Sequence, residues 1–238
     1  MLLQFIKEIK KKVAFKKHFS ERKTLLAGER FKCKWEDRYP CLFDNTATTS
    51  FDAHYLYHTA WAARILAKNV PHKHLDIGSC LRFVSIVSAF IPVEFYDYRP
   101  TKITLSGLKA GGADLLSLPF AEGTISSLSC MHVVEHIGLE RYGDAFAPEG
   151  DLQAMAELER VLSKKGTLLF VVPIGEEARI QYNAHRIYTY EQIISYFPSC
   201  SLKSFSLILD NGKFIDRASQ KDTCGQKYAC GCFEIVKF

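Results

Sequence analysis

From about residue 72 onward, short continuous apolar runs alternate with segments whose apolar residues have helical spacing. Continuous apolar runs are typical of buried strands, and the helical spacing indicates helices with one buried face. The predicted strands are His74–Ile77, Val93–Asp97, Thr124–Met131, Thr167–Val172, Leu202–Leu209 and Cys232–Phe238. The predicted helices between them are Leu81–Phe90, Asp151–Leu162 and Thr189–Phe197. This alternation, followed by two late strands, predicts an α/β fold with a mostly parallel sheet and an antiparallel addition.

Polar residues and glycines mark the ends of these elements. Asp151 and Thr189 are predicted to cap the starts of their helices, and the run Lys164-Lys165-Gly166 is predicted to end the first of them. The segment Ile103–Ala113 carries several glycines, which weaken any strand prediction there.

The first 71 residues follow a different pattern. Residues 1–23 are predicted to form a basic amphipathic helix with eight lysines and arginines, two glutamates and a net charge of +6. Its apolar side consists of Leu2, Phe5, Ile6, Ile9 and Val13. Such a helix suits an anionic membrane surface, although it could also pack on its own domain or on a partner. Residues 24–71 are interpreted as a linker and helical cap, with a helix from about residue 51 to 68, and residues 72–238 as the α/β domain.

Composition narrows the class of protein. No stretch is apolar for long enough to cross a membrane, and the N-terminus lacks the apolar core and cleavage site of a secretory signal. The eight cysteines are scattered, which is typical of reduced thiols in a cytoplasmic protein. Outside residues 1–23 the net charge is −1, so no nucleic-acid groove is expected. The spacing of Cys224, Cys230 and Cys232 fits no common zinc module, and no metal site is predicted.

Acidic side chains end two successive predicted strands. Asp76 is followed by a turn at Gly78, and Asp97 ends the next strand 21 residues later. Asp114 and the run His132–His136 follow further along. An open α/β sheet binds adenosine-containing cofactors at the carboxyl ends of its strands, where a carboxylate accepts the ribose hydroxyls. These residues therefore predict a nucleotide-type cofactor site.

With these residues the sequence resembles class I S-adenosylmethionine-dependent methyltransferases, from about residue 72 to 238. The matching segments are HLDIGS, VEFYDYRP, ADLLSLPF, ISSLSCMHVVEHIG and ELERVLSKKGTLLFVVP. It is most similar to an uncharacterised methyltransferase-like family of bacterial type, through HVVEHIGLERYGD, PEGDLQAMAELERVL and NAHRIYTYEQI. The resemblance implies a Rossmann-like sheet, mostly parallel with one antiparallel strand, preceded by an N-terminal helical extension.

The resemblance also implies S-adenosyl-L-methionine as cofactor and assigns its contacts. Asp76, Gly78 and Ser79 would lie beside its methionine part. Asp97 with Tyr98 would hold the ribose, Asp114 with Leu115 would contact adenine, and His132 would line the methyl-transfer pocket. The turn departs from the usual pattern, because Gly78 is its only glycine and Ser79-Cys80-Leu81 follows.

Methyl transfer to a hydroxyl needs a base that takes up its proton. The candidates are His136, Glu135, His185 and Asp144, together with His132. Arg141 and Arg186 could bind an anionic group of the acceptor, and Asp52 and His54 could border the pocket. Structural alternatives remain, since Glu135 and His136 could cap a helix and His185-Arg186 could anchor a loop.

The predicted function is transfer of a methyl group, at oxygen, to a small molecule or glycan. The alternative is a catalytically inactive, methyltransferase-like binding or scaffold protein at the membrane surface. An NAD-dependent enzyme is disfavoured because the sequence lacks a GxGxxG turn. The expected location is the cytoplasm, with peripheral contact at the inner membrane surface through residues 1–23.

Overall fold

The computed structural model describes residues 2–238, with side chains from residue 4 onward. Met1 and the Leu2 side chain, both part of the predicted amphipathic helix, lie outside this description. The chain divides into a unit that ends at Phe51 and a unit from Asp52 to Phe238. None of the helices in residues 2–238 combines the length and the apolar character needed to cross a bilayer.

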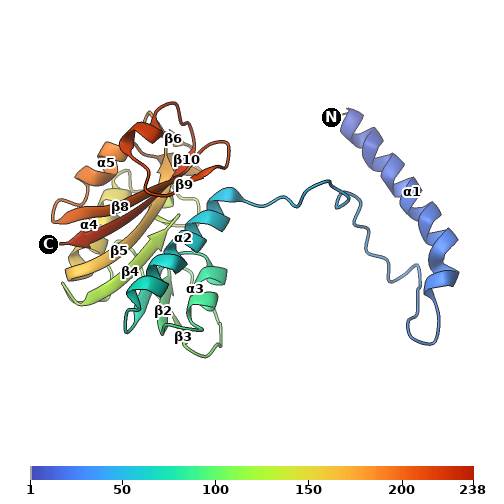
Figure 1. Ribbon diagram of the computed structural model, residues 1–238, viewed down its shortest axis with the longest axis horizontal. Helices are drawn as coiled ribbons and strands as arrows, with labels where there is room; N and C mark the ends of the chain where they lie inside the picture. The colour runs from blue at the N-terminus through green and yellow to red at the C-terminus, as the bar shows by residue number, and fades with distance from the viewer. Residues whose placement is uncertain (1) are drawn as a thin grey trace. The chain divides into compact units, whose positions relative to one another are not determined.

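The second unit is built on an eight-stranded sheet (Figure 1). In spatial order its strands are β3 (Leu108–Gly112), β2 (Val93–Asp97), β1 (His74–Ile77), β4 (Ile125–Met131), β5 (Leu162–Ile174), β10 (Ala229–Lys237), β8 (Cys200–Ile208) and β9 (Phe214–Ile215). The five strands from β3 to β5 are parallel, and β10 runs antiparallel to both β5 and β8. The mostly parallel sheet predicted from the sequence is confirmed.

Helices cover both faces of this sheet. On one face, α2 (Ala53–Asn69) and α3 (Leu81–Val87) supply Trp61, Leu66 and Phe83 to a buried cluster. On the other face, α4 (Gly150–Val161) and α5 (Tyr190–Ser195) supply their apolar residues to a second cluster. The central strand β5 serves both, because successive strand residues point to opposite faces. The residues of β5 that pack on the α4 side are Leu168, Phe170, Val172 and Ile174. Leu169 and Val171 pack on the α2 side.

Several predicted boundaries differ in the structure. The segment Ile103–Ala113 contains the strand β3, and Gly111 fits there because the Tyr96 ring lies where a side chain would stand. Residues Lys164–Gly166 lie within β5 instead of ending a helix, because the chain turns directly from α4 into the strand at Leu162.

A further correction concerns the start of α4. The residue that precedes α4 is Glu149, and Asp151 lies inside the first turn. Asp151 provides no cap because its carboxylate accepts a hydrogen bond from the Tyr188 hydroxyl and faces the Arg186 guanidinium. The compact unit that contains the sheet runs from Asp52 to Phe238, and α2 contributes to its core. Thr189 does cap α5, in a capping box with Gln192.

Connecting segments complete the second unit. A separate hairpin is formed by β6 (Arg179–Gln181) and β7 (His185–Ile187). Two short 3-10 helices, η1 (Val134–His136) and η2 (Gln220–Thr223), follow β4 and precede β10. The η1 helix begins directly beyond the carboxyl end of β4, so its side chains lie at the edge of the sheet where a site is expected.

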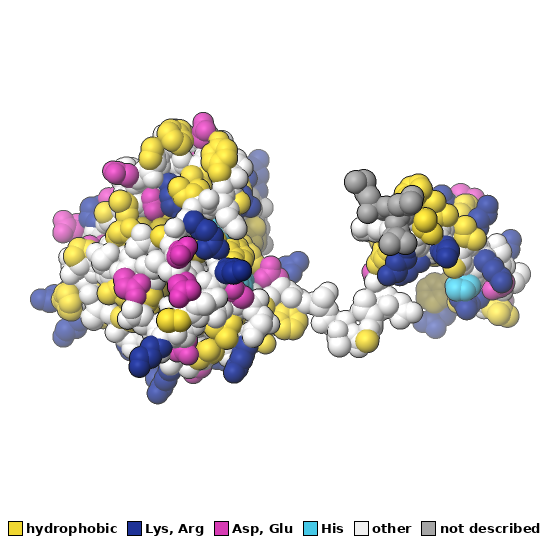
Figure 2. Space-filling model, turned by 90° about the horizontal axis from the view of Figure 1, so that it is seen from above, with side chains coloured by type: hydrophobic (Ala, Val, Ile, Leu, Met, Phe, Trp, Pro, Cys, Tyr) yellow, Lys and Arg dark blue, Asp and Glu magenta, His cyan; other side chains and the backbone are white. Residues whose placement is uncertain are grey.

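The first unit contains the helix α1 (Leu2–Leu26) and the segment that follows it. One side of α1 is covered, because Phe15 and Phe19 pack against Trp35 with ring centroids 6.1 and 5.0 Å apart. Lysines and hydrophobic side chains are both exposed on this unit (Figure 2). The exposed apolar residues include Phe5, Ile9 and Val13.

Candidate functional site

A cavity of about 260 Å³ lies at the carboxyl ends of β1, β2 and β4, and we call it the sheet-edge cavity. Its polar wall includes Asp97, Tyr98, Arg99, Asp114, His132, His136 and Asp144, with Gly78 and Leu115 among the remaining lining residues. Most of the residues predicted for the cofactor therefore meet around one space.

The turn after β1 is fixed by the carboxylate of Asp76, which is fully buried. One of its oxygens accepts the Ser79 amide hydrogen at 3.0 Å, and the other accepts the Ser129 hydroxyl. Burial raises the pKa of Asp76 to about 6, although these hydrogen bonds favour the charged form. The Ser79 hydroxyl accepts the Met131 amide hydrogen. Asp76 and Ser79 thus hold the turn and do not line the sheet-edge cavity.

Gly78 lies in this turn with φ of +67°, a conformation that favours glycine. A Cβ atom added there would stand 3.1 Å from the side chain of Val133, so the backbone of β1 and the start of η1 approach closely. The Gly78 amide donates to the Tyr96 carbonyl at 2.7 Å, which ties the turn to β2.

Asp97 and Asp114 present carboxylates to the same cavity. Oδ1 of Asp97 accepts the Arg99 amide hydrogen at 2.7 Å, and Oδ1 of Asp114 accepts that of Leu116 at 2.9 Å. Each bond fixes one oxygen of its carboxylate. Among the hydrogen bonds of the described residues, the second oxygen of each takes no part, so it can accept from a ligand.

A second cavity of about 450 Å³, the histidine cavity, adjoins the first. Its lining includes His54, Tyr55, His132, Glu135, His136, Arg141, Tyr142, His185 and Tyr228. Four of these residues, namely Tyr55, His132, His136 and Tyr142, line the sheet-edge cavity as well. The two cavities therefore share a wall of aromatic and imidazole side chains.

His132 is the central side chain of that shared wall. Its Nδ1 lies 2.8 Å from Oε1 of Glu135, and its Nε2 lies 3.3 Å from Sγ of Cys230. Burial lowers the pKa of His132, but Cys230 and the Glu135 carboxylate outweigh that effect and raise it to about 10. Burial would raise the pKa of Glu135, yet its pKa is lowered because His132 donates to it.

The other histidines of the cavity are held neutral. Burial, followed by the neighbouring His132, lowers the pKa of His54 to about 4. Burial also lowers the pKa of His136 and of His185. Nδ1 of His136 lies 2.7 Å from the Ala184 carbonyl, so it carries the hydrogen and leaves Nε2 with a lone pair. Neutral imidazoles of this kind can accept a proton at neutral pH.

Two residues that were predicted for the acceptor site form hydrogen bonds to the backbone of the loop after η1. Asp144 accepts the amide hydrogens of Gly138 and Tyr142, at 2.7 and 3.1 Å, so both of its oxygens shape the loop while it lines the sheet-edge cavity. Arg186 is buried and donates to the carbonyls of Ile137 and Pro148. The structural alternative, that Arg186 anchors a loop, is therefore the one observed. Arg141 is exposed and lines the histidine cavity.

Sequence reasoning did not single out Tyr55, Tyr228 or Cys230 as site residues. Tyr55 directly follows His54 on α2, and only Asp52 and His54 of that segment had been predicted to border the pocket. Tyr228 lines the histidine cavity from the residue before β10, and Cys230 on β10 contacts His132, which lies 98 positions earlier in the chain. The only available signal was the local cysteine cluster, which does not reveal its histidine neighbours.

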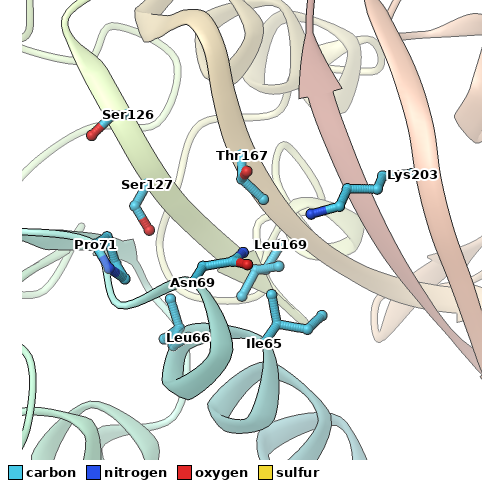
Figure 3. A pocket seen from close by; sticks show the side chains of 9 residues that line it. All are labelled: Ile65, Leu66, Asn69, Pro71, Ser126, Ser127, Thr167, Leu169 and Lys203. Atoms are coloured by element: carbon cyan, nitrogen blue, oxygen red, sulfur yellow. The ribbon is translucent and has the colours of Figure 1, made fainter.

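A third cavity, of about 420 Å³, lies at the opposite edge of the sheet, where β4 and β5 begin (Figure 3). Asn69 and Leu66 from the end of α2 form one side, and Lys203 extends from β8 on the other. Nζ of Lys203 is paired with Glu234 at 2.8 Å. Ligands of open α/β sheets bind at the carboxyl ends of strands, so this cavity is not the candidate site.

Comparison with known proteins places the fold. Residues 108–198 match the family described as Caenorhabditis protein of unknown function, DUF268. No curated protein matches the sequence. Among solved structures, a putative sarcosine dimethylglycine methyltransferase from Galdieria sulphuraria is similar with a TM-score of 0.54 and 12% identity, over 76% of this chain and 86% of that one. The chain has the class I methyltransferase fold.

Two further structures show the same architecture. The 1,6-didemethyltoxoflavin-N1-methyltransferase of Burkholderia thailandensis, solved with S-adenosylhomocysteine, has a TM-score of 0.52 and 10% identity, over 76% of this chain and 79% of that one. The [4+2]-cyclase SpnF has a TM-score of 0.51 and 12% identity, over 75% and 81%. At these identities the likeness concerns the fold, and a cyclase among the similar structures shows that the fold does not determine the reaction.

Proposed function

We propose that this protein is an S-adenosylmethionine-dependent methyltransferase that acts on an oxygen atom of a small molecule or glycan. The observation that carries the proposal is the pair of cavities that share the wall of Tyr55, His132, His136 and Tyr142. One cavity offers carboxylates at strand ends and the other offers neutral imidazoles. This arrangement suits a nucleoside cofactor on one side and an acceptor on the other.

The residues of the sheet-edge cavity fit the cofactor. Asp97 has an oxygen free to accept ribose hydroxyls and Asp114 has one to accept the adenine amino group, while Gly78 and Leu115 line the same space. S-adenosylmethionine, when bound there, supplies an electrophilic methyl group. The protein then needs to orient the acceptor and exclude water, which accounts for much of the rate of such reactions.

The histidine cavity supplies the groups that an acceptor requires. Nε2 of His136 or a ring nitrogen of His185 can take up the hydroxyl proton as the oxygen is methylated, because both rings are neutral. The exposed guanidinium of Arg141 can bind an anionic group of the acceptor. The cavity volume lies within the range typical of small-molecule sites.

The proposal is tested by calorimetric titration of the full chain with S-adenosylhomocysteine. The Asp97→Asn variant removes the charge that accepts the ribose hydroxyls, so affinity should fall by about 10- to 100-fold, as expected for a lost charge-assisted hydrogen bond. Glu94→Gln is the matched control, because Glu94 lies on the same strand outside the cavity. An absence of binding by the unmodified chain at high micromolar ligand would refute the proposal.

We further propose that α1 contacts an anionic membrane surface. Phe5, Ile9 and Val13 recur at intervals of four on one side of α1 and are exposed by 61, 45 and 64%. Phe15 and Phe19, which pack against Trp35, follow these residues along the helix and leave them exposed. Exposed apolar residues flanked by lysines are the combination that binds at lipid headgroups. Charge complementarity therefore supports an anionic lipid surface as the partner.

A further inference from the structure

Three side chains with metal-binding atoms converge from distant parts of the second unit. His54 comes from the first turn of α2, His132 from the end of β4 and Cys230 from β10. One ligand atom from each lies within 4.8 Å of the others, and Nε2 of His132 is 3.3 Å from Sγ of Cys230. Such separations are close to those between donor atoms around a single metal ion, whose bonds to nitrogen and sulfur are about 2.0 to 2.3 Å long.

The surroundings of His132 match those of a histidine that ligates a metal. Its Nδ1 is bonded to the buried carboxylate of Glu135 at 2.8 Å, which directs Nε2 towards Cys230 and His54. Metal-ligating histidines almost always donate their other ring hydrogen to a carboxylate or carbonyl. His132 also has a φ of +57°, a strained conformation for a residue other than glycine, and such strain clusters at functional sites.

Unpaired acceptor atoms lie beside this cluster. Among the described residues, His58 Nε2 and Glu135 Oε2 are the buried side-chain atoms that have no hydrogen-bond partner. The His58 ring meets the His132 ring edge to face at 5.1 Å, and its Nδ1 is bonded to the His54 carbonyl. Buried polar atoms without partners are uncommon in folded proteins, and an ion bound nearby would account for these two.

We propose that His54, His132 and Cys230 bind one Zn²⁺ ion. Imidazole nitrogen together with thiolate sulfur is a donor set that zinc prefers, whereas Mg²⁺ and Ca²⁺ prefer oxygen. Binding expels the thiol proton of Cys230 and the proton on Nε2 of His132 to solvent, because metal ligands must be deprotonated. Three protein ligands leave one position of a tetrahedral ion open, as in catalytic zinc sites.

This site adds a metal to a chain for which the sequence predicted none. His54 and His132 both line the histidine cavity, so a molecule in that cavity can reach the open position. A zinc-bound oxygen or sulfur loses its proton more readily than the free group. The ion would thereby activate an acceptor, yet its binding requires neither cofactor nor acceptor.

The test begins with the metal content of the purified full chain, measured by plasma mass spectrometry. The chain is then stripped with a chelator and titrated with Zn²⁺, and with Co²⁺ to record the thiolate-to-metal absorption band. We expect one ion per chain and a cobalt band. Cys230→Ala and His54→Gln should each weaken Zn²⁺ binding by more than 100-fold, and Cys230→Ala should abolish the band. Glu135→Gln should weaken binding by about 10- to 100-fold, as other changes behind a metal ligand do.

Cys130→Ala is the matched control, because Cys130 is equally buried but packs on the opposite face of the sheet. It should bind Zn²⁺ as the unmodified chain does. The proposal fails if the stripped, folded chain binds no stoichiometric Zn²⁺ at micromolar concentration, a result that needs no variant. It fails equally if Cys230→Ala and His54→Gln retain full affinity, since the ion would then lie elsewhere. Circular dichroism verifies that each variant is folded.

Discussion

At the scale of single residues, burial decides which acidic side chains are available to a ligand. Asp76 and Asp97 both lie at the carboxyl ends of strands and look equivalent in the sequence, yet Asp76 is fully buried and bonded to Ser79 and Ser129. Asp97 is half-buried and lines the sheet-edge cavity. The sequence could predict Asp97 as a ligand-binding residue because it ends a strand. It could not reveal that the Ser129 hydroxyl, 53 positions away, donates a hydrogen bond to Asp76.

The same buried network determines the state of His74. Its Nδ1 lies 2.8 Å from the Ser127 hydroxyl and its Nε2 2.9 Å from that of Ser129. Since Ser129 donates its hydrogen to Asp76, its oxygen accepts from Nε2, and Ser127 donates to Nδ1. Every hydrogen bond of the ring is thus satisfied by neutral imidazole, and burial lowers the pKa of His74 to about 3.

This shift predicts that His74 makes stability depend on pH. The unfolded chain protonates His74 near its ordinary pKa of 6.5, whereas the folded protein does so near 3, so the free energy of unfolding falls as the pH falls through that window. The contribution approaches about 1.4 kcal/mol per pH unit. Asp76 acts in the opposite direction below about pH 6, because its pKa is raised in the fold. Urea unfolding at pH 6.5, 5.75 and 5 should show a shallower fall for His74→Gln than for the unmodified chain.

His72→Gln is the matched control for this measurement, since His72 is exposed two positions earlier. It should leave the pH dependence of unfolding unchanged. Identical slopes for His74→Gln and the unmodified chain would contradict the assignment of a neutral, buried His74.

At the scale of elements, the loop from Gly138 to Gly150 is held in place by a side chain from the β6–β7 hairpin. Arg186 donates to the carbonyls of Ile137 and Pro148, and its Nε lies 3.4 Å from the carboxylate of Asp151 at the start of α4. Gly138 permits the close approach, because a Cβ atom there would lie 2.0 Å from the Ala147 carbonyl oxygen. The hairpin, the loop and α4 therefore form one connected wall of the site.

Arg186→Gln is predicted to destabilise the fold by about 3 kcal/mol or more. The change leaves the Asp151 carboxylate and one loop carbonyl buried with fewer donors, and breaking a buried ion pair has a large cost. Urea unfolding at pH 7 measures the difference. Arg64→Gln on the exposed side of α2 should change the free energy of unfolding by less than about 0.5 kcal/mol. Equal stability of Arg186→Gln and the unmodified chain would contradict the anchoring role.

The helices and strands show where hydrophobic pattern is sufficient and where it is not. Strands such as β1 and β2 were predicted to the residue, because each is a short run rich in apolar residues between polar or turn-forming neighbours. The strand β3 was obscured by its glycines, of which Gly111 packs under Tyr96, a contact invisible in the sequence. The hairpin of β6 and β7 was missed because three-residue strands carry too few positions to show a period.

At the scale of the whole molecule, the fold explains why residues far apart in sequence share one site. Parallel strands bring Gly78, Asp97 and His132 to one edge, and the antiparallel β10 brings Cys230 to the same place. The sequence predicted the first group because each member ends a strand. It could not predict Cys230 or Tyr228, because their position depends on how β10 inserts between β5 and β8.

The exposed side of α1 predicts that the full chain binds vesicles of mixed phosphatidylserine and phosphatidylcholine. Burial of apolar side chains contributes about 1.5 to 3 kcal/mol each when complete, and each lysine near an anionic surface contributes about 1 kcal/mol. The double variant Ile9→Ser, Val13→Ser should therefore bind at least about tenfold more weakly in a co-sedimentation assay. The charge is unchanged in that variant, so the loss would report the apolar contact alone.

Ala14→Ser, also exposed on α1, should bind as the unmodified chain does. Raising the salt concentration should weaken binding of every form, because screening acts on the lysines. Equal sedimentation with anionic and purely phosphatidylcholine vesicles would contradict the electrostatic part of the contact, and undiminished binding of the double variant would contradict the apolar part.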